Sequence, residues 1–211
     1  MFFIKKKMKK ITILITVLLM VSCKPLAKII FHVKSPDFET IDKQRKFLKK
    51  NKVFVSDFFY FKDFNSFTSA SKNRYLSIPD AFFFNKEGNL VRYKKSSSDC
   101  NAKVGDFIND LKEFSNAPSD SSININKLLP LFESESKIEI KKTDVTVFLT
   151  WAVFAGKVNK NKTFEWIKLL EKAKSNGINI SFYLINCDLQ DSWNLTNEQK
   201  NKIIKLIKIN S

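Results

Sequence analysis

The chain has little of what most catalytic and metal sites need: one histidine, three cysteines and four glycines in 211 residues. A zinc site of the usual types requires more cysteine and histidine than this, and no Cys-x-x-Cys pair is present. The glycines are isolated from one another, so no glycine-rich loop is available to cradle a phosphate group. The sequence therefore predicts no metal and no cofactor, and His32, inside an apolar run, is expected to be a buried core residue.

What the chain does have is an export-like N-terminus. A basic stretch, MFFIKKKMKK, precedes an apolar run that is too short to span a membrane, and this run ends at Cys23. The run LMVSC resembles the lipobox of bacterial lipoproteins, with Met20 where the pattern prefers Leu, Val or Ile. The resemblance implies a signal peptide at 1–22, lipidation of Cys23 and a short anchor segment at 23–26. The alternative is an ordinary signal peptide with an incidental cysteine.

Positive charge is the next strong feature, since 37 Lys and Arg stand against 21 Asp and Glu, a formal charge of +16. The lysines are spread along the chain without an aromatic and basic RNA-binding motif, so we expect no nucleic-acid binding. For an exported, lipid-anchored chain, the expected counterparts are the membrane and acidic polymers of the bacterial cell envelope. An outer-membrane location is mildly preferred, because no acidic retention signal follows Cys23.

Hydrophobic periodicity predicts a β-α-β-α-β-β-α series in residues 27–115. The helix at 35–51 is expected to begin with Ser35 as N-cap and Pro36 at its first position. The remaining elements are strands at 27–33 and 52–61, helices at 63–76 and 102–114, and a hairpin at 77–94.

The hairpin SIPDAFFFNKEGNLV and the order of these elements resemble the thioredoxin-like fold, a three-layer α/β sandwich. In that family, an Ile-Pro pair with a cis bond opens the first hairpin strand beside the active-site loop, and its backbone meets extended peptides. The resemblance makes Pro79 the matching residue. The other interpretation is that Pro79 simply begins an edge strand, a position that proline tolerates well.

Residues 116–142 are rich in serine and acidic residues, and we interpret them as a linker partly packed on the surface. Residues 143–211 then repeat a β-α-β-α pattern, which corresponds to an incomplete second thioredoxin-like unit. Its helix at 163–177 has Thr163 as the expected N-cap and Gly177 just beyond its end. Thr196 and Gln199 stand at capping-box spacing at the start of the last predicted helix. Two architectures remain open: a full domain at 27–115 followed by this incomplete unit, or one permuted sheet to which both contribute.

The stretch TWAVFAGKVNK resembles the thioredoxin pattern Trp-Ala-x-Trp-Cys-Gly-x-Cys. Trp151 falls on the first tryptophan, Phe154 on the second aromatic and Gly156 on the glycine, while Ala155 and Val158 take the places of the two cysteines. Disulfide exchange needs a thiolate and a resolving thiol, so this corner is expected to be redox-inactive. With Pro79, four of these residues, Trp151, Phe154, Ala155 and Gly156, are expected to shape a peptide-binding groove. The alternative is that its aromatic residues belong to the core.

Three functions remain open. The first is a lipid-anchored binding or accessory module for a peptide or protein partner. The second is a thiol enzyme of variant type that uses Cys100 or Cys187, although Cys187 is expected to be buried and inert. The third is a structural or immunity-type lipoprotein. The sequence favours the first and gives no partner, ligand or oligomeric state.

Overall fold

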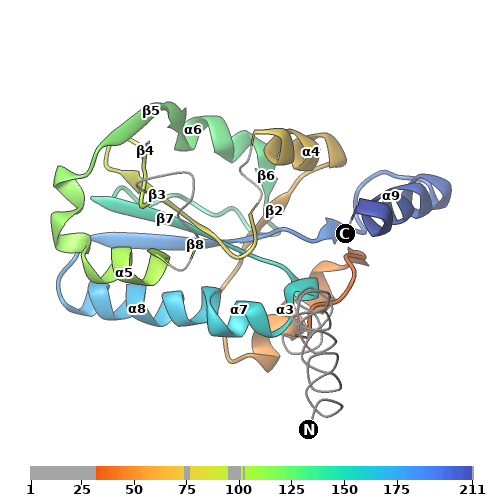
Figure 1. The fold of residues 1–211 in the computed structure, drawn as a ribbon, viewed down its shortest axis with the longest axis horizontal. Coiled ribbons are helices and arrows are strands. Elements are labelled where there is room, and N and C mark those ends of the chain that lie inside the picture. The colour runs from red at the N-terminus through yellow and green to blue at the C-terminus, as the bar shows by residue number, and fades with distance from the viewer. Residues whose placement is uncertain (1–31, 74–76, 95–100, 102, 211) are drawn as a thin grey trace, which may run out of the picture.

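Seven strands form one mixed sheet in the order β5-β4-β3-β7-β8-β2-β6 (Figure 1). Its centre is the parallel pair β7 (Val145–Trp151) and β8 (Ile180–Asn186), and β2 (Phe59–Phe61) continues the parallel part. On the other side of β7, the antiparallel hairpin of β3 (Ala81–Asn85) and β4 (Asn89–Val91) completes the middle of the sheet. The hairpin and its Asn-Lys-Glu-Gly-Asn turn are therefore confirmed.

The computed structural model describes residues 32–73, 77–94, 101 and 103–210. The expected signal peptide, the expected lipidation site Cys23, and Cys100 lie outside the described residues. Within them, every helix is too short or too polar to cross a membrane.

Strands from both halves of the chain share this sheet, because β3 pairs along its whole length with β7. Of the two architectures left open by the sequence, the structure has the single sheet. Residues 27–115 and 143–211 are therefore interleaved in one α/β fold rather than placed in two separate sheets.

The segment 116–142 differs most from its expected role as a linker. It supplies both edges of the sheet, β5 (Ser119–Asn124) beside β4 and β6 (Phe132–Glu133) beside β2. Between them, the short helix α6 (Ile125–Leu128) and the 3-10 turn Leu129–Leu131 pack against the sheet. The sequence did not predict these strands, because β5 is polar, β6 has only two residues, and both form by pairing with distant strands.

Helices cover both faces of the sheet (Figure 1). On one face lie α3 (Ile41–Lys50), α5 (Lys103–Asn109) and α8 (Thr163–Ser175), which follows the short helix α7 (Lys157–Asn161). The 3-10 helix Leu111–Asn116 continues from α5. The other face carries α4 (Phe64–Lys72), α6 and part of α9 (Asn197–Asn210). The result is a three-layer α/β/α arrangement.

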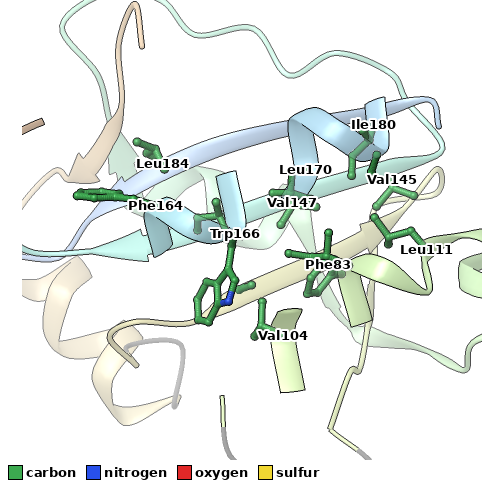
Figure 2. Close-up of a cluster of buried hydrophobic side chains, with 14 of the residues drawn as sticks. Phe83, Val104, Leu111, Val145, Val147, Phe164, Trp166, Leu170, Ile180 and Leu184 are labelled. Atoms are coloured by element: carbon green, nitrogen blue, oxygen red, sulfur yellow. The ribbon is translucent and has the colours of Figure 1, made fainter. Parts of the chain in front are cut away.

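Alternating side chains of β7 feed two separate cores, as expected for a strand buried on both faces. Val145, Val147, Leu149 and Trp151 join the core under α3, α5 and α8. Figure 2 shows that core, with side chains of α5 and α8 meeting those of the central strands. Phe148 points to the opposite face, where an aromatic cluster forms. That cluster includes Phe59, Phe61, Phe84, Phe132 and Trp193.

Two helix starts differ from the prediction, and one is confirmed. α3 begins at Ile41 with Thr40 as N-cap, because residues Phe38–Glu39 form a short strand, β1, instead of a first helical turn. Thr163 does not cap α8, since its hydroxyl donates to the carbonyl oxygen of Thr150 at 2.9 Å. At α9, Thr196 and Gln199 form the expected capping box, with reciprocal hydrogen bonds of 2.8 and 3.3 Å.

The N-terminal strand prediction fails where it can be checked. His32 is an exposed turn residue with a φ of 51°, so the prediction of a core histidine is wrong. Of the strand expected at 52–61, only β2 pairs with neighbouring strands, and Lys52 is a turn residue with a φ of 59°.

Candidate functional site

The parallel strands β7 and β8 end side by side, and the chain turns sharply after each one. Ligand sites of open α/β sheets lie at such carboxyl ends. After Trp151, the 3-10 helix Val153–Ala155 leads into α7, and the amide of Cys187 donates to the carbonyl oxygen of Trp151 at 2.8 Å. We call residues 150–156 and 186–190, together with Pro79, the strand-end corner.

Pro79 is joined to the end of β7 through Asp80, the residue that follows it. The Ile78-Pro79 bond is cis, as predicted. Asp80 then meets Thr150 twice: its carbonyl accepts from the amide of Thr150 at 3.0 Å, and its amide donates to the Thr150 hydroxyl at 2.7 Å. The structure therefore brings Pro79 and the end of β7 together. A pocket of about 360 Å³ opens beside Asp80, but none of the five expected groove residues lines it.

Trp151 is a core residue. Its side chain is fully buried and lies between the rings of Phe47, stacked at a centroid distance of 5.9 Å, and Phe58, edge-on at 5.4 Å. Its indole Nε1 is buried and has no hydrogen-bond partner among the described residues. The indole therefore supports the corner from below and does not offer a surface to a ligand.

The residues that align with the two cysteines of the thioredoxin pattern, Ala155 and Val158, lie in a closed turn and the helix after it. Ala155 is buried, while Phe154 and Val158 are half-buried. Gly156 has a φ of 54° and a ψ of −127°, which a residue with a Cβ avoids, so a glycine is required there. The buried Asn159, which sequence reasoning missed, fixes this turn. Its amide group donates to the carbonyl oxygens of Ala152 and Gly156 and accepts from the Ala152 amide.

A buried carboxyl group lies directly under the turn. Asp188 is fully buried and accepts from the amides of Val153 at 2.8 Å and Phe154 at 3.5 Å, and from Asn186 Nδ2 at 2.8 Å. Burial raises its pKa to about 7, against the opposing effect of these hydrogen bonds, and the nearby charge of Glu39 adds to the increase. Asp188 is therefore a buried group that titrates near neutrality.

Buried amide side chains connect Asp188 to α3. Asn186 Oδ1 accepts from Gln190 Nε2 at 2.9 Å, and Gln190 Oε1 accepts from Gln44 Nε2 at 2.9 Å. All three amides are fully buried, and Gln44 Oε1 has no partner among the described residues. The sequence analysis missed this polar chain. The alternation of Asn186, Asp188 and Gln190 after an apolar strand was an available signal, because it places all three on one side of the backbone.

An extended segment of the chain itself lies across the corner. The amide of Lys34 donates to the carbonyl oxygen of Phe154 at 2.8 Å. Further along, β1 pairs in parallel with β9 (Leu189–Gln190), and the Phe38 ring meets Trp193 edge-on at 6.2 Å. The corner thus binds extended backbone by strand-type contacts, and residues 34–39 occupy it.

Thiol chemistry finds no support in the described residues. Cys187 is free and buried, as expected, and its Sγ donates to the carbonyl oxygen of Ile185 at 3.6 Å. Burial, together with the charge of Asp188, holds the pKa of this thiol well above its ordinary value. Cys187 is therefore a poor nucleophile.

Metal chemistry also lacks a site in the part of the chain that the structure describes, because no three potential ligand side chains of His, Cys, Asp or Glu come together there. Comparisons with protein-family models, with curated proteins and with solved structures found no match to this chain.

Proposed function

We propose that this protein is a lipid-anchored lipoprotein of the bacterial cell envelope whose strand-end corner binds an extended segment of a peptide or protein partner. The observation that carries the proposal is the seating of residues 34–39 on the corner. Their backbone is held by the carbonyl of Phe154 and by β9, which are contacts that a partner strand of different sequence would also make.

We further propose that the fold is thioredoxin-like, with its elements in permuted order. The parallel β7-α8-β8 unit, with the β3-β4 hairpin antiparallel on β7, supports this assignment. In this arrangement, the hairpin precedes the unit in the chain instead of following it. The turn after Trp151 then occupies the position of a dithiol site, and it holds Ala155 and Val158 in place of cysteines.

Competition between the chain's own segment and an added peptide tests the binding proposal. The probe is a fluorescent peptide with the sequence of residues 32–40, and binding is measured by anisotropy on the full chain. A tethered segment competes at an effective concentration near millimolar, so wild type is expected to bind the probe weakly. Phe38→Ala, which removes the ring that meets Trp193, is expected to bind it at least about tenfold more tightly.

Two controls make this experiment specific. Lys34→Pro removes the N–H that donates to Phe154 and should also expose the corner, without truncating the ring of Phe38. A matched peptide with alanine at the position of Phe38 should bind at least about tenfold more weakly than the probe. If neither variant binds the probe more tightly than wild type while both melt cooperatively, the corner is not a peptide site.

Introducing thiols at positions 155 and 158 tests the thioredoxin-like assignment. We expect the double variant Ala155→Cys, Val158→Cys to oxidise to an intramolecular disulfide in a glutathione buffer, measured as a mass loss of two hydrogens. The control is Val158→Cys, Asn161→Cys, which has the same spacing but lies entirely within α7. If the first pair stays reduced where the control pair oxidises, Ala155 and Val158 do not correspond to dithiol positions.

A further inference from the structure

α3 and the turn after it form a basic surface with one exposed aromatic ring, and this surface is not part of the strand-end corner. The lysines at 46, 49 and 50 recur at helical neighbour spacing, so they lie on one face of α3, and Lys52 follows in the turn. All four are exposed. Phe54 stands at the tip of this turn with 81% of its side chain exposed. We call these five residues the basic tip.

The lysines of the basic tip differ from the other basic residues of α3. Lys43 pairs with Glu39, and Arg45 is held between Asp57 and Glu135. In contrast, none of the four basic-tip lysines forms an ion pair with any described residue. The exposed acid of α3, Asp42, lies one helical turn before Lys46 without forming an ion pair with it, and it lies about two turns from Lys49. The tip thus presents uncompensated positive charge.

The exposed ring of Phe54 adds an apolar component to this charge. Its neighbours Val53 and Val55 are half-buried, and together with Leu48 and Phe58 they border a shallow hollow of about 200 Å³. Lys52 has a left-handed backbone with a φ of 59°, which turns the chain just before the ring. An exposed aromatic ring within a cluster of lysines fits the boundary between anionic headgroups and acyl chains.

We propose that the basic tip docks on an anionic membrane surface, with Phe54 entering the interface and the four lysines facing phosphate groups. The proposal rests on the membrane location proposed above, but it does not depend on any binding at the corner. A chain held at Cys23 stays close to the membrane, because the segment between Cys23 and His32 spans at most about 30 Å. α3 lies on the side of the sheet that α7 and α8 also cover (Figure 1).

A tryptophan at position 54 reports this docking, because the native tryptophans are all buried, with exposures of 0% to 4%. The experiment uses the full chain with Phe54→Trp in vesicles of equal parts phosphatidylcholine and phosphatidylglycerol, with brominated lipid as quencher. The matched control is Leu206→Trp on α9, at the other strongly exposed large apolar residue among those that the structure describes. We expect the signal at position 54 to be quenched at least about threefold more than the signal at position 206.

Charge dependence completes the test. Each lysine near an anionic surface strengthens binding about fivefold, so Lys46→Gln, Lys49→Gln and Lys50→Gln together should reduce the quenching at position 54 to the level of the control. Pure phosphatidylcholine vesicles should give the same reduction. Equal quenching at both positions, or quenching that survives in neutral vesicles or after the lysine substitutions, would overturn the proposal. If the basic tip instead contacts a protein partner, position 54 should be quenched no more than position 206, and the proposal is overturned.

The anchor and the tip can fail independently. Lipid labelling of wild type and of Cys23→Ser tests the anchor, and label that persists in the variant contradicts it. Quenching at position 54 is compared with quenching at position 206 in the same vesicles, so any attachment through the N-terminus is common to both and the difference reports the tip.

Discussion

Replacing Trp151 with alanine is expected to lower the free energy of unfolding by about 3–5 kcal/mol, the usual cost of deleting a large buried aromatic side chain. The effect should be at the upper end of this range, because the indole is fully buried and packs against Phe47 of α3 and Phe58, which directly precedes β2. Chemical denaturation with circular dichroism measures the change.

A milder substitution distinguishes packing from hydrogen bonding at the same site. Trp151→Phe loses volume, but it also removes a buried N–H that has no partner among the described residues. Because an unsatisfied buried donor costs about 1–3 kcal/mol, the two effects should nearly cancel, leaving a change of about 1 kcal/mol or less. A loss as large as that of the alanine variant would mean that the indole N–H is satisfied after all.

Asp188→Asn is expected to stabilise the protein above neutral pH and to remove much of its pH dependence between about pH 4 and pH 7. In the folded protein the pKa of Asp188 is raised to about 7 from its ordinary 3.8. Between these two values the folded state holds a proton that the unfolded state has lost. Ionisation of Asp188 in the unfolded chain therefore favours unfolding more and more as the pH rises through this interval. The full difference corresponds to about 4 kcal/mol at pH 8.

Asparagine fits this site with little rearrangement. Its Oδ1 can accept from the Val153 amide and from Asn186, as Asp188 Oδ2 does at 2.8 Å in both cases. Its Nδ2 replaces Oδ1, whose hydrogen bond with Phe154 is long at 3.5 Å. Unfolding of both proteins across this pH range gives the difference, from which other carboxyl groups cancel. Parallel curves would contradict the raised pKa.

Sequence periodicity predicted the elements whose pattern is set by their own residues. The hairpin around Gly88, strands β7 and β8, and the buried face of α8 all follow from local alternation or helical spacing. Elements that exist only through distant partners were missed. β1 depends on β9, and the two edge strands depend on β4 and β2, so the start of α3 and the role of 116–142 were misjudged.

The corner was located from sequence, but its interior was not. The Trp-Ala pair and the Ile-Pro pair identified two segments that the structure brings together. The polar chain from Asp188 to Gln44 was not predicted, because polar side chains of helices and strand ends usually face solvent. Gln44 nevertheless shares a helical face with Ile41 and Leu48, and this spacing alone places it inward.

The two edge strands affect the tendency of the protein to aggregate. Open edges of a phenylalanine-rich sheet invite pairing with other chains, and proteins suppress this with short or charged outer strands. Here a single segment, 116–142, covers both edges, with the serine-rich β5, which carries Asp120, on one side and the two-residue β6 on the other. A single cleavage in that segment would loosen both edge strands, so resistance to proteolysis and resistance to aggregation are coupled in this chain.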